Sequence, residues 1–225
     1  GASFRSKAGT WEKCGSGKWA DISIFSFHPV KHIASGEGGM ITTNNRALYD
    51  KVSLLRTHGI TRDTASYQNR DMAGEGAWYY EMQELGFNYR MPDILAALGL
   101  SQLRRAEEGL ARRRAIARRY DSAFANSSAA PMIPTESELH AYHLYIVRVE
   151  NRRAVYDRLR EKGILAQVHY VPVHLQPFYR RLGFGPGDFP AAEQFYSSAI
   201  SLPMFPGLSD SDVDRVIASV LESVE

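Results

Sequence analysis

Apolar residues recur every three or four positions in several stretches of the chain, a spacing that places them on one face of an α-helix. The helices predicted in this way are 46–56, a helix beginning at Pro92, 107–124, 152–162 and a helix that starts near Ser209. The last has the most regular stripe, formed by Val213, Val216, Ile217, Val220, Leu221 and Val224. Asn44-Asn45 offers an N-cap for the first helix, and a proline suits the first turn of a helix.

Runs rich in β-branched and aromatic residues predict strands at 22–27, 40–43, 142–149 and 164–169. The first of these is expected to be buried. Residues 5–20 are polar and glycine-rich, which indicates a hairpin-like excursion. Residues 59–84 have no clean period and are expected to form a long irregular loop. The strand, helix, strand order after residue 126 indicates a small α/β domain, so the chain is divided into 1–106 and 107–225.

Composition places the chain among ordinary globular proteins, with 44% hydrophobic and 23% charged residues. The net charge of +2 gives no reason to expect nucleic acid as a partner. One cysteine, Cys14, excludes an internal disulfide framework. No apolar run approaches the roughly 20 residues that cross a bilayer, so no membrane is expected and the predicted location is cytoplasmic.

A single lysine, Lys31, follows the first predicted strand and Pro29, and the glycine-rich turn 36–39 comes shortly after it. A lysine that attacks a carbonyl must be neutral, and partial burial favours the neutral amine. By spacing alone, a solvated loop lysine is the favoured interpretation, since it describes most lysines that follow a strand. Ser26, at the end of the strand, is suited either to donate to a phosphate or to cap a turn.

Three ordered blocks resemble one family. They are Ser26-Phe27-His28-Pro29-Val30-Lys31 with the 36–39 turn, Leu85-Gly86-Phe87-Asn88-Tyr89-Arg90-Met91 with 96–103, and His169-Tyr170-Val171-Pro172-Val173-His174-Leu175-Gln176-Pro177-Phe178-Tyr179. Together they resemble the DegT/StrS-type sugar aminotransferases, which use pyridoxal 5′-phosphate and have the α/β aminotransferase fold of type I. The segments 57–60, 78–82 and 201–206 are most similar to the branch that aminates a UDP-linked 4-keto-6-deoxy-N-acetyl sugar in pseudaminic acid biosynthesis.

The resemblance implies the roles of particular residues. Lys31 would hold pyridoxal phosphate covalently and act as the general base, and Ser26 would donate to the cofactor phosphate. Asn88 would reach the phosphate in a second copy of the chain, which requires a homodimer with shared active sites. Arg90 is assigned to an acidic part of the substrate, and His174 to a weaker substrate contact. L-Glutamate would be the amino donor.

The same resemblance implies that 1–106 is the C-terminal portion of the cofactor-binding large domain, with part of its parallel or mixed sheet, and that 107–225 is the small α/β domain. The family's longer N-terminal half carries part of the phosphate cradle, a ring-stacking aromatic and an aspartate paired with the ring nitrogen. These lie upstream of the matched blocks. We therefore expect a fragment, whose own activity is uncertain.

Other interpretations stay open. Asn88 and Arg90 could be a loop amide and a surface ion pair, and His28 and His58 are expected to be structural. His169 and His174 without nearby cysteines make a poor metal site, so no metal is predicted. The arginine-rich 104–119 segment indicates a solvated helix face relieved by Glu107 and Glu108 rather than a nucleic-acid surface.

Two competing functions remain. The first is a pyridoxal-phosphate sugar dehydratase, although such enzymes resemble this family with histidine in place of the lysine. The second is a truncated or non-catalytic module that binds a nucleotide or the cofactor and uses the 36–39 turn to hold an anion.

Overall fold

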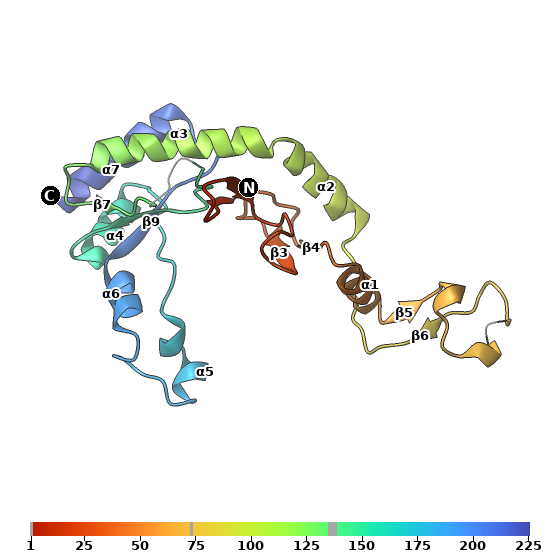
Figure 1. The fold of residues 1–225 in the computed structure, drawn as a ribbon. Coiled ribbons are helices and arrows are strands. Elements are labelled where there is room, and N and C mark those ends of the chain that lie inside the picture. The colour runs from red at the N-terminus through yellow and green to blue at the C-terminus, as the bar shows by residue number, and fades with distance from the viewer. Residues whose placement is uncertain (1, 73, 135–138) are drawn as a thin grey trace. The chain divides into compact units, whose positions relative to one another are not determined.

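The computed structural model describes residues 2–72, 74–134 and 139–225. The chain forms two compact units, one of residues Phe4–Ala106 and the other of Glu107–Glu225 together with Ala2 and Ser3. Figure 1 labels most of the helices and strands of both units. No helix among the described residues is long and apolar enough to cross a membrane.

Short two-stranded sheets and two longer helices make up the N-terminal unit in the part of the chain that the structure describes. The strand pairs are β1 (Ser3–Arg5) with β2 (Trp11–Lys13), β3 (Ser23–Ser26) with β4 (Gly39–Thr42), and β5 (Ile60–Thr61) with β6 (Glu81–Met82). The helices are α1 (Arg46–Leu55) and α2 (Asp93–Arg104), with two 3-10 turns, η1 (Thr64–Ser66) and η2 (Arg70–Met72). The pair β1–β2 confirms the hairpin-like excursion predicted near the start of the chain.

The antiparallel pair β3–β4 lies where two strands were predicted, but the prediction that the first is buried is wrong. The pair runs from Ser23 opposite Thr42 to Ser26 opposite Gly39. Ile24 at its centre is 77% exposed. Within the described residues β3 and β4 form a two-stranded sheet of their own, and Phe25 beside Ile24 is only half-buried.

The first helix is confirmed with its predicted cap. The side chain of Asn45 accepts a hydrogen bond from the N–H of Leu48 at 3.2 Å, which satisfies one of the free donors at the start of α1. Pro92 is the N-cap of α2 rather than its first helical residue. The predicted apolar face of α2 is largely uncovered, since Ile94 is 81% exposed.

The segment 59–84 is more ordered than predicted. It contains the antiparallel ladder β5–β6, in which Ile60 lies opposite Met82, and the turns η1 and η2. Its centre is the carboxylate of Glu81. That carboxylate accepts hydrogen bonds from the backbone of Gln68 and from the backbone of Asn69 at 3.1 Å, and it also accepts bonds from the Tyr79 hydroxyl at 3.2 Å and the Gln83 amide at 2.9 Å. Burial alone would raise the pKa of Glu81, but these bonds together lower it.

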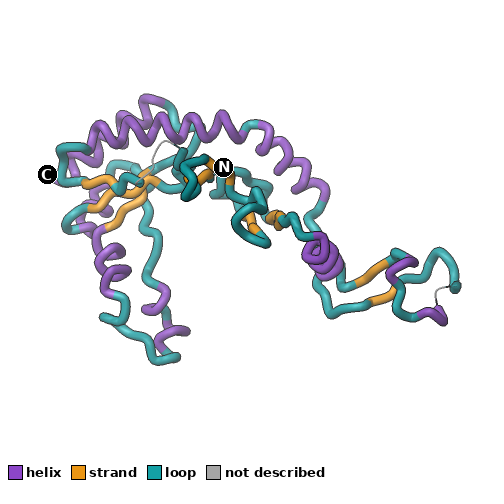
Figure 2. The backbone as a smooth tube through the Cα atoms, in the orientation of Figure 1, coloured by secondary structure: helices purple, strands orange, loops and turns teal. Residues whose placement is uncertain are grey.

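Where the structure describes it, the C-terminal unit is a three-stranded antiparallel sheet with helices, as the α/β prediction requires. The strand order is β7 (Ala130–Pro131), β8 (Tyr145–Arg148), β9 (Ala199–Leu202). The helices are α3 (Ala106–Phe124), α4 (Arg152–Glu161), α5 (Pro177–Arg180), α6 (Pro190–Ser198) and α7 (Asp210–Val224), with the 3-10 turn η3 (Val173–Leu175). Figure 2 shows the strands of this sheet in orange between the purple helices.

One hydrophobic core joins the sheet to α3, α4 and α7. Its fully buried members include Tyr120, Phe124, Val147, Leu159, Ile200, Val213 and Val220. The buried rings keep their hydroxyls bonded, since Tyr120 donates to the carbonyl of Pro203 at 3.0 Å and Tyr145 donates to Asp121 at 2.7 Å. Burial raises the pKa of both phenols, so they act here as neutral donors.

The predicted C-terminal helix is confirmed and begins with a capping box in which Ser209 and Asp212 bond each other's backbone. The prediction of a strand at 164–169 is wrong. That segment makes a single bridge, in which Gln167 and Ser201 exchange backbone hydrogen bonds of 3.0 and 2.8 Å. Only this one position pairs with β9, so the segment does not form a full ladder.

Candidate functional site

Lys31 lies on the lysine loop, the segment 27–38 that connects β3 to β4. Phe27 closes the base of the loop, because its N–H donates to the carbonyl of Gly38 and its carbonyl accepts from Ser35, both at 2.9 Å. The N–H of Lys31 donates to the carbonyl of His28 at 2.9 Å and so forms a tight turn. Lys31 is half-buried. The predicted loop therefore exists, and its ends are fixed by the strand pair.

The lysine loop packs against helix α2. Ser35 is fully buried, and its hydroxyl donates to the carbonyl of Glu37 at 2.9 Å. A Cβ built on Gly99 of α2 would lie 3.5 Å from the Cβ of Ser35, and one built on Gly36 would lie 3.5 Å from Leu95. Gly99, which has no side chain, therefore lets the loop approach the backbone of α2 closely.

Ser26, the last residue of β3, lies in the same turn. Its hydroxyl accepts a hydrogen bond from the N–H of His28 at 3.4 Å. Since this contact uses one lone pair of an exposed oxygen, the O–H remains available to donate to an anion. The turn-capping interpretation describes the contact seen here, and the phosphate role stays a prediction.

Asn88 and Arg90 lie on an extended segment anchored to the end of α1. Phe87 donates to the carbonyl of Leu55 at 2.8 Å and accepts from His58 at 2.9 Å, and Asn88 bridges Thr57. The rings of Phe87 and Tyr89 stack with centroids 5.2 Å apart. Because side chains alternate along an extended chain, Asn88 and Arg90 belong to the opposite face, and both are exposed.

Two glycines make this anchoring possible. A Cβ on Gly86 would lie 2.2 Å from the N atom of Gly59 and 2.7 Å from the carbonyl of Leu55. A Cβ on Gly59 would lie 1.8 Å from the carbonyl oxygen of Glu84, and Gly59 has a φ of +67°. The backbones cross too closely for any side chain, so glycine is required at both positions.

His174 belongs to the C-terminal unit and is only 7% exposed. Its Nε2 lies 2.8 Å from Oε1 of Glu193 in α6, and its ring lies 4.8 Å from that of Phe189. Glu193 also accepts from the N–H of Gly187 at 2.7 Å. The bond to His174 is the main cause of the lowered pKa of Glu193. Sequence reasoning did not find Glu193, because nineteen positions separate it from its partner.

His169 is also held by a neighbour. Its Nδ1 lies 2.8 Å from the hydroxyl of Ser201, and burial lowers its pKa. His169 and His174 therefore bond to different partners. Among the described residues, no group of three or more histidine, cysteine or acidic side chains is arranged to hold a metal ion.

The arginines of α3 differ from the solvated face expected for them. Arg113 is 5% exposed and donates to the carbonyls of Tyr142 at 3.0 Å and Met204 at 2.7 Å; burial lowers its pKa. Arg119 forms ion pairs with Asp210, at 2.7 Å, and with Asp214, both on α7. These arginines bind neighbouring segments of the unit, and acids on α7 pair with Arg112 and Arg119.

The sequence and the fold of this chain are similar to those of known proteins. Residues 7–221 match the model of the DegT/DnrJ/EryC1/StrS aminotransferase family. The Uncharacterized protein MJ1066 of Methanocaldococcus jannaschii is 40% identical over 217 residues, which cover 92% of this chain and 55% of that protein. The spore coat polysaccharide biosynthesis protein SpsC of Bacillus subtilis is 38% identical over 219 residues, which cover 93% of this chain and 55% of that protein.

Solved structures with a similar fold include aminotransferases as well. The putative sugar aminotransferase Spr1654 of Streptococcus pneumoniae, in its PMP-form, has a TM-score of 0.82 at 35% identity, over 93% of this chain and 54% of that one. Helicobacter pylori PseC, an aminotransferase involved in the biosynthesis of pseudoaminic acid, has a TM-score of 0.80 at 32% identity, over 91% of this chain and 53% of that one.

These matches place the chain in the class of α/β proteins with the type I aminotransferase fold. The chain belongs to the DegT/DnrJ/EryC1/StrS aminotransferase family. The predicted family and fold class are thereby confirmed. The chain spans about half the length of the curated relatives it matches.

Proposed function

We propose that the protein to which this chain belongs is a pyridoxal-phosphate-dependent sugar aminotransferase. It would transfer the amino group of L-glutamate to the 4-keto carbon of a UDP-linked 6-deoxy-N-acetyl sugar, the chemistry of a pseudaminic-acid type of pathway. Such an enzyme works where nucleotide-activated sugars are made, so we place it in the cytoplasm.

The observation that carries this proposal is the lysine loop. Its base is fixed by Phe27, its far side packs on α2, and it holds the half-buried Lys31 in a defined turn. A family match over 7–221 and a TM-score of 0.81 to Spr1654 in its PLP-form add support from outside the chain.

The donor set of this loop fits the chemistry of the cofactor. Pyridoxal phosphate offers an aldehyde and a phosphate, and when bound it supplies the electron sink for transamination. The primary amine of Lys31 suits the aldehyde, and the hydroxyl of Ser26 suits the phosphate. Lys31, once free, would take and return the proton that moves during the transfer.

We assign the remaining residues by their exposure and charge. Asn88 and Arg90 lie on an exposed face, where a second copy of the chain could receive them; Asn88 would donate to the cofactor phosphate of that copy in a homodimer. The planar guanidinium of Arg90 suits a phosphate or carboxylate of the substrate. His174 would approach the sugar nucleotide with its ring oriented by Glu193.

The test begins with the visible spectrum of the purified protein supplied with pyridoxal phosphate. Lys31→Ala should lack the absorption band of the lysine-bound cofactor, and Lys7→Ala, an exposed lysine in another turn, should keep it. Glutamate should bleach the band, and a panel of UDP-4-keto sugars should restore it. The assay is run on the chain and on a form of it extended by the N-terminal half of a family relative.

The outcomes separate the alternatives. A band retained in Lys31→Ala contradicts the lysine assignment. A band that glutamate does not bleach, with loss of water from the sugar, indicates a dehydratase. A protein that stays colourless in both forms indicates a binding module.

A further inference from the structure

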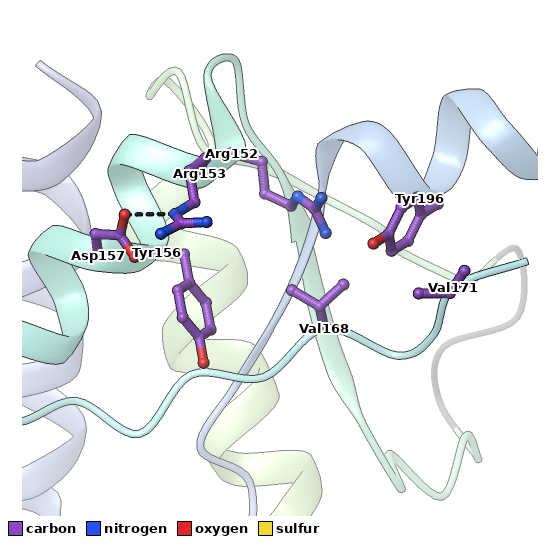
Figure 3. A pocket seen from close by; sticks show the side chains of 7 residues that line it. All are labelled: Arg152, Arg153, Tyr156, Asp157, Val168, Val171 and Tyr196. Atoms are coloured by element: carbon purple, nitrogen blue, oxygen red, sulfur yellow. Dashed lines mark hydrogen bonds and ion pairs between the residues drawn. The ribbon is translucent and has the colours of Figure 1, made fainter.

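A pocket of about 360 Å³ lies in the C-terminal unit, within the size range of sites that bind small molecules. It is formed by the first turns of α4, the extended segment after Gly163 and the last turn of α6 (Figure 3). Its lining residues are Arg152, Arg153, Tyr156, Asp157, Val168, Val171 and Tyr196. No residue assigned to the proposed transamination is among them.

Arg152 gives the pocket a fixed cation. In Figure 3 its side chain extends from α4 toward the ring of Tyr196, and the guanidinium carbon lies 4.5 Å from the ring centroid. Stacking on an aromatic face orients a guanidinium while leaving its N–H edge available to donate. Among the residues that the structure describes, no carboxylate pairs with Arg152.

The rest of the lining keeps the pocket positive. Arg153 pairs with Asp157 at 2.6 Å, so these two charges cancel and the charge of Arg152 remains. Helix α4 begins at the same place, and Asn151, its N-cap, makes no side-chain capping bond. The positive end of the helix dipole therefore adds to the guanidinium, and both favour an anion.

The pocket also has surfaces for a flat ring. Val168 and Val171 supply an apolar surface, and Figure 3 places Val168 between the side chains of Tyr156 and Tyr196. The two phenol hydroxyls are able both to donate and to accept hydrogen bonds, as the edge of a nucleobase requires. A simple inorganic anion would use only the Arg152 end of such a pocket.

We propose that this pocket binds a nucleoside phosphate, with the phosphate on Arg152 and the base against Val168, Tyr156 and Tyr196. The inference goes beyond the proposed function and does not depend on it, because it rests on residues of the C-terminal unit alone.

The experiment is calorimetric titration of the chain with uridine 5′-monophosphate, adenosine 5′-monophosphate, uridine or inorganic phosphate. Arg152→Gln should weaken binding of a nucleoside monophosphate by tenfold or more, and Arg152→Lys should restore part of it. Arg180→Gln, which removes one exposed charge outside the pocket, is the matched control. Circular dichroism shows whether each variant is folded. Tyr196→Ala should reduce the preference for a nucleotide over phosphate, and Tyr196→Phe, which loses only the hydroxyl, should reduce it by less.

Each result decides the proposal. Equal weakening by Arg152→Gln and Arg180→Gln overturns it, as does binding of phosphate as tight as that of either nucleotide. Absence of nucleotide binding to the folded chain also overturns it. The Lys31→Ala protein should bind the nucleotide unchanged at this pocket, so a failure here is distinguishable from a failure of the aminotransferase assignment.

Discussion

The imidazole of His174 and the carboxylate of Glu193 form a hydrogen-bonded pair, with Nε2 and Oε1 2.8 Å apart. The same oxygen holds the backbone of Gly187. One side chain of α6 therefore secures both ends of the segment that includes η3 and α5. Because His174 bonds through Nε2, the carboxylate fixes the orientation of the ring.

Glu193→Gln tests this pair through its dependence on pH. The pKa of Glu193 is lowered in the folded chain, mainly by the bond to His174, so the stabilising contribution is present above the ordinary glutamate pKa of about 4.3 and is lost as the pH falls through the lowered value. We expect Glu193→Gln to reduce the melting temperature at neutral pH and to have a smaller effect below about pH 4. Glu161→Gln, at an exposed position of α4, is the control. An equal reduction of the melting temperature at both pH values would contradict a role for the negative charge of Glu193.

Ser26→Ala tests the phosphate role. Losing one hydrogen bond to a charged group, worth about 1.5–3 kcal/mol, should weaken cofactor affinity by about tenfold or more. The absorption band of the lysine-bound cofactor should still form at saturating cofactor. Ser23→Ala, on the same strand, should leave the affinity unchanged. An identical dissociation constant for Ser26→Ala and the parent chain would leave Ser26 as a turn residue only.

Arg113→Met tests the buried guanidinium of α3. The substitution leaves the carbonyls of Tyr142 and Met204 without the donors they have now, which should lower the free energy of unfolding by about 1–3 kcal/mol. Arg118→Met removes an exposed arginine from the same helix and should have little effect. Urea denaturation of the two variants measures the difference. If both variants lose the same free energy of unfolding, the cause is the loss of a positive charge from the helix and not the loss of the hydrogen bonds to the carbonyls.

Gly86→Ala tests the backbone crossing that anchors Asn88. An added Cβ would meet the backbone of Gly59 at 2.2 Å, so we expect a loss of about 1–3 kcal/mol in the free energy of unfolding. The matched control is Gly74→Ala, whose Cβ would have no atom within 4 Å. Hydrogen exchange at the amides of Phe87 and Tyr89 reports the local loss directly. Equal protection of these amides in both variants would show that the backbone at the crossing adjusts to the added methyl group at little cost in free energy.

Local patterns predicted the helices well and the long-range contacts poorly. The helix after Asn45 and the helix after Ser209 were correct because their caps and apolar stripes lie within a few residues of each other. The exposure of Ile24 was missed, since a strand's sequence does not say what covers it.

The candidate site shows the same limit. The lysine turn was predicted because its chemistry sits in one contiguous block, and the structure packs that block on Gly99. Glu193 and the partners of Arg113 were not predicted. Each of these contacts joins segments that are far apart in the sequence, and the spacing of apolar residues within a short window does not predict such contacts.

The hydrogen bonds around Glu81 have a consequence for how this family could diversify. All of these bonds join Glu81 to residues between Gln68 and Gln83. The segment is therefore stabilised by hydrogen bonds within itself. We expect a segment of this kind to keep its fold when it is exchanged between homologous chains, as long as the carboxylate and its donors are kept. Chimeras whose junctions lie outside 60–83, so that Glu81 and its donors are moved together, should therefore keep the hydrogen bonds of this segment.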